Sequence, residues 1–194
     1  AWERALSRPA KLAYCESPSN PTIEIVDIEA LGAICRAQQC LFVVDNCFMT
    51  PVLQTPLSMG ADLVIHSATK YLDGQGRVLG GAVLGPAELV EPVTAFIRSG
   101  GVTISAFNAW IFLKGLETLD IRMKAHSENA HQLAAWLVEQ PQIAHVNYAG
   151  LPSHPQKQLI DRQMQSGGGV LSFSLKDGGR EEAWSFLNAT CLMS

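Results

Sequence analysis

A lysine, two hydroxyl side chains and an aspartate follow two apolar segments of this chain. Lys70 ends a polar run that also contains Ser67 and Thr69 and comes directly after the apolar residues 63–65. Asp45 ends the preceding apolar segment in the same way. A lysine attacks carbonyl carbons when part of it is deprotonated, which burial or a neighbouring cation can arrange. These residue types therefore favour covalent chemistry on a carbonyl group beside a carboxylate.

The hydroxyls and the carboxylate suit a cofactor that is anionic at one end and basic at the other. Ser67 and Thr69 are two residues apart, so in an extended chain both hydroxyls project to the same side. Hydroxyls and backbone N–H groups at a strand end suit a phosphate, and Asp45 suits a protonated ring nitrogen. A lysine Schiff base with an acidic pyridinium partner is the arrangement of a pyridoxal phosphate enzyme.

Each of these residues also has an ordinary structural explanation. A lone strand-end aspartate is commonly a turn residue, and a lone lysine after a strand is commonly solvated. Asn20 lies in a turn that Pro18 and Pro21 make rigid, and a turn asparagine often bonds its own backbone. The combination is more specific than any one member: Asn20, Asp45, Ser67, Thr69 and Lys70.

The surrounding segments predict a parallel sheet that would position these side chains. Residues 41–44 and 63–65 are continuous apolar strands, of the kind that is buried on both faces of a parallel sheet. Asp27 is a good N-cap for a helix between a first strand, residues 11–15, and residues 41–44. Ligands of open α/β sheets bind beyond the carboxyl ends of the strands, so we expect the candidate residues at that edge.

The glycine-rich segment 74–81 resembles a dinucleotide-binding motif only superficially. Leu79 stands where the third glycine of G-x-G-x-x-G should be, and the segment precedes a strand instead of opening a helix. A nicotinamide cofactor is therefore not predicted. The glycines are expected to let the backbone pass close to a bound group or to another subunit.

The second half of the chain predicts a long helix and then a smaller α/β unit. Residues 88–97 are expected to be helical, and apolar residues at steps of three and four predict one long amphipathic helix after Phe107. Its stripe is Leu116, Leu119, Met123, His126, Ala130, Leu133 and Leu137. Beyond Pro141 we expect strands at 143–148 and 170–175, helices at 156–165 and 180–188, and a new strand from Cys191.

Composition indicates an ordinary, well-buried globular protein. Hydrophobic residues make up 47% and charged residues 16% of the 194 residues, and the net charge is −4. There is no lysine/arginine cluster, so no nucleic-acid partner is expected. No apolar run reaches membrane-span length and no signal peptide is recognisable, so no membrane partner is expected. The five cysteines have irregular spacing and no C-x-x-C, which predicts reduced, mostly buried thiols in a cytoplasmic protein.

Three motifs resemble the Cys/Met-metabolism family of pyridoxal phosphate enzymes, and the resemblance covers essentially the whole chain. They are Glu16-Ser-Pro-Ser-Asn-Pro21, Val43-Val-Asp-Asn46 and His66-Ser-Ala-Thr-Lys-Tyr71. Within the family, the O-succinylhomoserine sulfhydrylase group is the most similar. That similarity is carried by Asp73-Gly-Gln-Gly-Arg77, Phe107-Asn-Ala-Trp110, Leu113-Lys-Gly-Leu-Glu-Thr118 and Gly150-Leu-Pro-Ser-His-Pro155. Many relatives carry a Gly-His-Ser-Asp type of sequence after the lysine, where this chain has Gly74-Gln-Gly-Arg77.

The resemblance implies a role for each candidate residue. Lys70 would bond covalently to pyridoxal 5′-phosphate and move the α- and β-protons of the substrate. Asp45 would bind the pyridine nitrogen, Asn20 the phenolic oxygen, and Ser67 and Thr69 the phosphate. The implied fold is the aspartate aminotransferase-like fold (fold type I). Its large domain would cover residues 1–115, and the connecting helix with part of the C-terminal domain would cover residues 116–194.

The implied reaction is γ-replacement, in which O-succinylhomoserine and sulfide give homocysteine and succinate in methionine biosynthesis. A cystathionine γ-synthase or a γ-lyase of the same family is the enzymatic alternative. The chain looks like a central fragment, so a non-catalytic piece that acts only as a binding or assembly partner is the second alternative. Family relatives assemble as dimers of dimers, which implies a homo-oligomer for the full-length protein.

Overall fold

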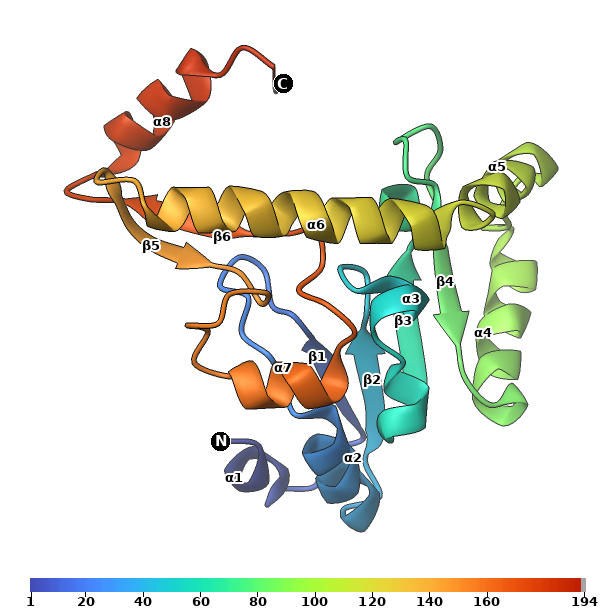
Figure 1. The fold of residues 1–194 in the computed structure, drawn as a ribbon. Coiled ribbons are helices and arrows are strands. Elements are labelled where there is room, and N and C mark those ends of the chain that lie inside the picture. The colour runs from blue at the N-terminus through green and yellow to red at the C-terminus, as the bar shows by residue number, and fades with distance from the viewer. Residues whose placement is uncertain (193–194) are drawn as a thin grey trace.

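The computed structural model describes residues 1–192, and its centre is a four-stranded sheet of order β1-β2-β3-β4 (Figure 1). Three strands are parallel, and the fourth runs antiparallel to β3. They are β1 (Leu12–Glu16), β2 (Leu41–Asp45), β3 (Leu63–Ser67) and β4 (Gly81–Leu84). The predicted α/β class with a mostly parallel sheet is confirmed.

One face of the sheet is covered by α2 (Ile28–Ala37). Asp27 caps this helix as predicted, because its carboxylate accepts the N–H of Ala30. The apolar stripe of α2 includes Ile28 and Leu31, which pack on Phe42 and other inward side chains of the strands. Burying this stripe fixes which residues of each strand face α2, and it leaves their neighbours on the opposite face.

Two short helices connect β2 to β3. The prolines Pro51 and Pro56 predict a short helix through Leu57 with Gly60 as its C-cap. The structure forms it as a 3₁₀ turn, η1 (Pro56–Met59), which Gly60 ends in the left-handed conformation with φ 101°. A further turn of helix, α3 (Thr50–Leu53), precedes it and was not predicted from the sequence.

The predicted long helix is two helices. After α4 (Ala87–Gly100), α5 (Ala106–Leu116) is separated from α6 (Leu119–Val138) by a turn at residues 117–118. The predicted stripe is partly wrong, since Ser127 and Ala134 are buried where His126 and Leu133 were expected, and Leu133 is 48% exposed. The stripe keeps its phase at Leu119, Met123, Ala130 and Leu137, which are buried as predicted, and at the other two positions the smaller neighbouring side chain faces the core.

The C-terminal elements form a second layer around α6. A two-stranded antiparallel sheet, β5 (Ile143–Asn147) and β6 (Ser172–Leu175), packs on its second half. The remaining helices are α1 (Trp2–Leu6), α7 (Lys157–Gln163) and α8 (Arg180–Ala189). The strand predicted from Cys191 is not formed at residues 191–192, and residues 193–194 lie outside the described part. No helix of the described residues is long and apolar enough to cross a membrane.

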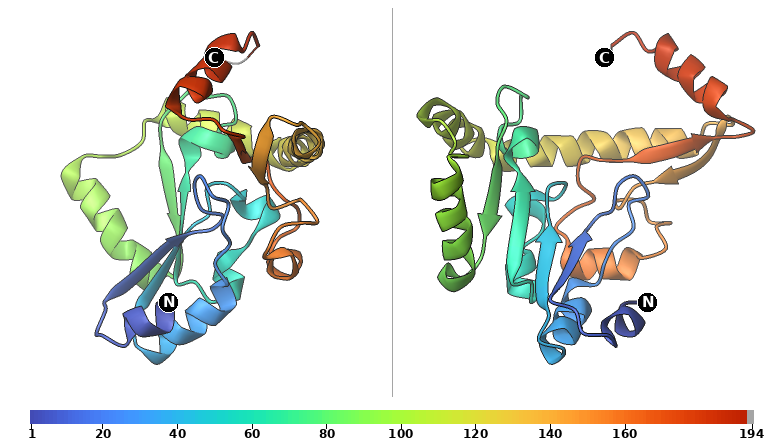
Figure 2. Two further views of the ribbon diagram at one scale, coloured as in Figure 1. Left: turned by 90° about the vertical axis from the view of Figure 1, so that its left-hand side faces the viewer. Right: turned by 180° about the vertical axis from the view of Figure 1, so that it is seen from behind.

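The long helix α6 bridges the two sheets (Figures 1 and 2). Its first half contributes Leu119 and Met123 to a core that also contains Ala68 and Leu72, beyond the carboxyl end of β3. Its second half contributes Ala130 and other residues to the core over β5 and β6. The helix α4 lies beside the edge strand β4, and α8 projects at the far end of α6. The domain limits 1–115 and 116–194 stay a prediction.

Candidate active site

Lys70 lies in a tight turn at the carboxyl end of β3. The strand ends at Ser67, and η2 (Ala68–Leu72) follows as a π-helical turn in which Lys70 has the non-helical angles φ −83° and ψ −116°. The expectation of an extended chain through Thr69 is therefore wrong. The chain coils because the turn buries Ala68 and Leu72 in the core beneath α6. Single π turns occur frequently at functional sites.

The hydroxyl of Thr69 is held by the backbone of Gly80. It accepts the Gly80 N–H at 3.0 Å and lies 3.3 Å from the carbonyl oxygen of the same residue. A hydroxyl has one proton and two acceptor sites. To donate to a phosphate, Thr69 must rotate its proton away from the Gly80 carbonyl.

Cys47 links the ends of β2 and β3. Its sulfur accepts the N–H of Ser67, and its own N–H donates to Oδ1 of Asp45 at 3.0 Å. Burial and the hydrogen bond with Asp45 raise the pKa of the thiol to about 11, while the charge of Lys70 opposes this. The thiol therefore stays protonated at neutral pH, and Cys47 joins two candidate residues, Asp45 and Ser67, through short contacts.

Asp45 accepts two hydrogen bonds at the end of β2. Besides the N–H of Cys47 on Oδ1, the Tyr14 hydroxyl donates to Oδ2 at 2.9 Å. Strand register explains this contact, because Tyr14 is aligned with Val43, two residues before Asp45 on the same sheet face. Each carboxylate oxygen has two acceptor sites, so both retain one for a ligand.

The amine of Lys70 is available for chemistry. The residue is exposed, and its Nζ lies 5.4 Å from the centre of the Phe48 ring. None of the ion pairs among residues 1–192 involves Lys70. No carboxylate holds this amine in an ion pair, so it is free to approach a carbonyl group.

His66 belongs to the same polar run but points to the other face of the sheet. It is 4% exposed, and its Nδ1 has no hydrogen-bond partner among the described residues. Burial lowers its pKa, although the charge of Asp45 opposes the shift. The neutral imidazole therefore lies on the face of the sheet that α2 covers, apart from Ser67 and Lys70.

Asn20 lies at the same edge of the sheet, in the turn after β1. Its backbone N–H is 3.3 Å from Oε2 of Glu16, and its side chain is exposed. The turn is closed by hydrogen bonds from Ser19 to Glu24 and from Ile23 to Ser19. The structure brings Asp45, Ser67, Thr69 and Lys70 to one sheet edge, and Cys47 links Asp45 to Ser67 there. Asn20 shares the edge without bonding to them.

Buried amide side chains hold this turn against the end of β2, and sequence reasoning missed them. Gln54 Nε2 donates to the Ser17 carbonyl and to Oδ1 of Asn46, and Gln163 Nε2 donates to Oε1 of Gln54. Gln163 also pairs with the backbone of Val26. Glutamines carry no periodic or spacing signal, so only the folded structure reveals the network.

A second unpredicted network holds the segment after Lys70. Asp73 is 1% exposed and accepts the backbone N–H and the Nε–H of Arg77. Arg122 of α6 donates to the Tyr71 and Gly115 carbonyls. The positive φ of 79° at Gly74 brings its backbone against the Arg122 guanidinium, where a Cβ would lie 2.2 Å from Nη1. Gly74 therefore lets the backbone approach a side chain of the same chain. The sequence predicted an approach to a bound group or to another subunit.

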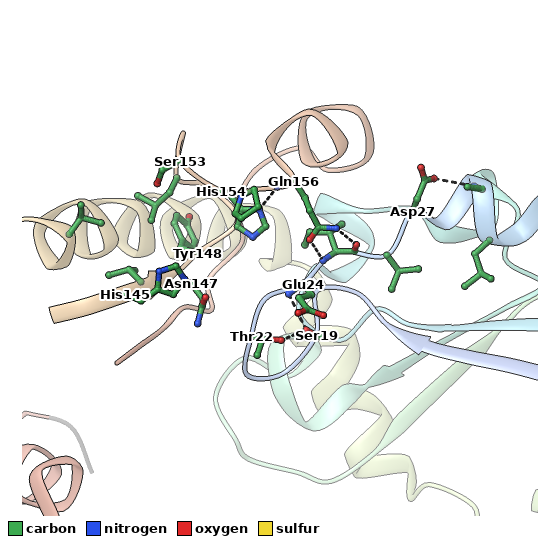
Figure 3. Close-up of a pocket in the computed structure, with 18 of the residues that line it drawn as sticks. Ser19, Thr22, Glu24, Asp27, His145, Asn147, Tyr148, Ser153, His154 and Gln156 are labelled. Carbon is green, nitrogen blue, oxygen red and sulfur yellow. Dashed lines mark hydrogen bonds between the residues drawn. The ribbon is translucent and has the colours of Figure 1, made fainter. Parts of the chain in front are cut away.

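A sizeable cavity of the described chain lies away from Lys70. It has a volume of about 970 Å³ and opens between residues 19–31 and residues 143–156 (Figure 3). Gln156 crosses it by pairing with both backbone groups of Ile25, and His154 Nε2 lies 3.2 Å from the Ile23 carbonyl. These contacts support the turn that carries Asn20, so the cavity wall contributes indirectly to the site.

The chain is similar in sequence and structure to known proteins. An O-succinylhomoserine sulfhydrylase from Pseudomonas aeruginosa is 58% identical over the whole chain, which covers 48% of that protein. An L-methionine γ-lyase from Pseudomonas putida is 41% identical, with 100% of this chain and 49% of the lyase covered. A crystal structure of cystathionine γ-synthase from Xanthomonas oryzae pv. oryzae matches with a TM-score of 0.95 and 38% identity, covering 100% of this chain and 50% of that one.

The chain spans about half the length of the curated relatives it matches. Its similarity to the family described as Cys/Met metabolism PLP-dependent enzyme extends over residues 1–194. Pyridoxal phosphate is the cofactor of that family, as the predicted site chemistry requires. The chain therefore belongs to the Cys/Met-metabolism family of pyridoxal phosphate-dependent enzymes.

Proposed function

We propose that Lys70 is the residue through which the complete natural protein binds pyridoxal phosphate and catalyses γ-replacement on an amino acid. The observation that carries the proposal is an unpaired amine on a π-helical turn, at the same strand edge as a carboxylate that two donors hold. Ligands of open α/β sheets bind at this edge, and the family membership supplies the chemistry.

The residues present fit the cofactor. Pyridoxal phosphate needs an amine for its aldehyde, an anion for its ring nitrogen and donors for its phosphate. Lys70 supplies the amine, and Asp45 has a free acceptor site on each oxygen. Ser67 and Thr69 supply hydroxyls at the end of β3, where Thr69 is fixed by Gly80. Asn20, at the same edge, is the proposed donor to the phenolic oxygen.

The chain's own residues then perform three tasks. Asp45, as a carboxylate, holds the proton of the ring nitrogen, while Ser67 and Thr69 anchor the opposite end. Lys70 Nζ removes the proton from Cα of the substrate, and it moves protons to and from Cβ. When bound, pyridoxal phosphate supplies an electron sink that stabilises negative charge at these carbons.

The proposed reaction exchanges the γ-ester of O-succinylhomoserine for sulfide, giving homocysteine and succinate. Support comes from the 58% identity with the Pseudomonas aeruginosa sulfhydrylase and from 46% identity with an O-succinylhomoserine sulfhydrylase of Mycobacterium tuberculosis. Cystathionine γ-synthase and methionine γ-lyase activities are the alternatives, favoured by the structural and sequence relatives that carry those names.

The complete protein is proposed to be a cytoplasmic homo-oligomer, a dimer of dimers. Buried, unpaired thiols at Cys15, Cys35, Cys40 and Cys47 suit a reducing compartment. A fragment that acts only as a binding or assembly partner is the non-catalytic alternative for the present chain.

Borohydride trapping tests the cofactor proposal. Pyridoxal phosphate is added to the complete protein and to residues 1–194, the bond is reduced, and the labelled peptide is identified by mass spectrometry. The expected label is on Lys70 in the complete protein, and Lys70→Ala should abolish it. Lys157, which pairs with Asp161 on α7, gives a matched control as Lys157→Ala and should leave the label intact. A label elsewhere, or none, contradicts the proposal.

Comparing nucleophiles tests the reaction. The complete, loaded enzyme receives O-succinylhomoserine with sulfide or with cysteine, and a second assay supplies methionine alone. Homocysteine from sulfide at the higher kcat/KM supports the sulfhydrylase. Cystathionine from cysteine at the higher value supports the synthase, and methanethiol from methionine supports the lyase. Residues 1–194 that carry the Lys70 label but form no product in any assay would support the non-catalytic alternative for this chain.

A further inference from the structure

The Tyr14 hydroxyl donates a hydrogen bond to the Asp45 carboxylate across the two neighbouring strands. The Oη to Oδ2 distance is 2.9 Å, within the usual range for a hydroxyl–carboxylate bond. The contact joins β1 to β2, and nothing in the family motifs assigned Tyr14 a role. Two observations bear on whether it is more than an incidental surface contact.

The first observation concerns the place of the contact in the sheet. Tyr14 is 49% exposed on the edge strand β1, where Leu12 on the same face is 51% exposed. Its ring is therefore not held there by a packed core. The aligned position of Tyr14 and Val43 directs the long side chain along the strand toward Asp45, so the hydroxyl bond fixes the orientation of both groups.

The second observation concerns the charge that the bond favours. The N–H of Cys47 and the O–H of Tyr14 both donate, one to each oxygen, and hydrogen bonds donated to a carboxyl group stabilise its charged form. Burial and the hydrogen bond and charge of Asp45 raise the pKa of Tyr14 to about 12. The phenol therefore remains a donor throughout the neutral range.

We infer that Tyr14 is a positioning residue for Asp45, which keeps the carboxylate oriented so that its remaining acceptor sites face the ring nitrogen of the cofactor. This inference rests on the proposed function, because it requires Asp45 to bind that nitrogen. Tyr14 itself touches neither the reacting atoms nor Lys70 among the contacts of the described residues. Its effect on the cofactor passes through Asp45.

Cofactor binding in a double-mutant cycle tests the inference. The dissociation constant of pyridoxal phosphate and the visible absorption maximum of the bound form are measured for the complete protein, Tyr14→Phe, Asp45→Asn and the double variant. Tyr14→Phe keeps the ring and removes only the hydroxyl. Losing one hydrogen bond to a charged group should weaken binding about 10-fold and move the absorption maximum in the same direction as Asp45→Asn.

The decisive result is the lack of additivity. If Tyr14 acts through Asp45, adding Tyr14→Phe to Asp45→Asn should change the dissociation constant less than about 2-fold. An equal loss in both backgrounds would overturn the inference and make Tyr14 an independent structural residue. An unchanged dissociation constant in Tyr14→Phe would overturn it as well.

A matched tyrosine and the Asp45 variant separate the possible failures. The Tyr148 hydroxyl donates to the Ser127 and Gly168 carbonyls in the core between α6 and β6. Tyr148→Phe should lower thermal stability without changing the absorption maximum, which is the signature of a purely structural hydroxyl. If Asp45→Asn leaves cofactor binding intact, the proposed role of Asp45 fails. If Asp45→Asn impairs binding and Tyr14→Phe does not, only the inference about Tyr14 fails.

Discussion

The turn that carries Lys70 is followed by an acid whose charge depends on one arginine. Burial alone would raise the pKa of Asp73, but the backbone bond, side-chain bond and charge of Arg77 together hold it below its usual value. A carboxyl group whose pKa is lower in the folded than in the unfolded state stabilises the fold above its unfolded pKa. That stabilisation is lost as the pH falls through the folded pKa.

Asp73→Asn should therefore change how stability depends on pH. At pH 7 the variant should unfold at lower denaturant concentration than the unmodified protein. The difference should shrink as the pH falls below about 4, near the usual aspartate pKa. Denaturant titrations of the complete protein at several pH values measure this. Asp120→Asn is the control, because the exposed pair of Asp120 with Lys124 contributes little. A difference that stays constant down to acid pH contradicts the role assigned to the Asp73 charge.

At the same scale, sequence reasoning found the residues that carry chemistry and missed those that hold them. Lys70, Asp45 and Ser67 were recognisable because reactive side chains directly follow apolar strands. The contacts of Tyr14, and of the Gln54 and Gln163 amides, join residues far apart in the chain. Such contacts depend on strand register and helix placement, which local patterns do not contain.

At the scale of elements, the packing of α5 on the Lys70 turn depends on one glycine. A Cβ at Gly115 would lie 2.1 Å from the carbonyl oxygen of Leu72 and 2.8 Å from that of Asp73. Both contacts are with backbone, which cannot move aside without shifting the turn. The carbonyl of Gly115 itself accepts a hydrogen bond from Arg122 of α6, so α5, α6 and the turn are fixed together.

Gly115→Ala should therefore destabilise the protein by about 3 kcal/mol, as expected for overpacking against a rigid neighbour. It should also weaken pyridoxal phosphate binding, because the turn carries Lys70. Gly100→Ala in α4 is the matched control, since its Cβ would meet only Val102 Cγ2 at 3.9 Å. There alanine should be neutral or stabilising by less than about 1 kcal/mol. Denaturation of both variants without cofactor, followed by cofactor titration, checks the expectation. Equal stability of the two variants would contradict it.

Strands and capped helices were predictable from sequence because their signals are local. Continuous apolar runs marked β2 and β3, and Asp27 marked the start of α2. The π turn after Ser67 was not predictable, because it forms to bury Ala68 and Leu72 under a helix some 50 residues later. The break between α5 and α6 escaped for a related reason, since no proline or glycine stands at residues 117–118.

At the scale of the whole molecule, α5 is more apolar than a surface helix should be. It buries Ile111 and Phe112 in the core, yet its outer side also presents large apolar side chains. These are Phe107 at 64%, Trp110 at 52% and Leu113 at 61% exposure. A helix that is apolar on all sides is normally buried. In the proposed homo-oligomer, we therefore expect the outer side of α5 to be covered by the rest of the complete protein or by a neighbouring subunit.

Trp110→Glu should therefore disturb the assembly of the complete protein. Burying an unpaired carboxylate costs several kcal/mol, so the complete protein should shift to smaller species or lose solubility. Sedimentation velocity measures the change. Lys114→Glu introduces the same side chain on the same helix, at a residue that already pairs with Glu117 in solvent, and it should leave the sedimentation profile unchanged. If both variants sediment like the unmodified protein, the outer side of α5 is a free surface and the apolar residues there serve neither assembly nor folding of the complete chain. If only Trp110→Glu changes the profile while Lys70 still takes the cofactor label, α5 belongs to the assembly and not to the cofactor site.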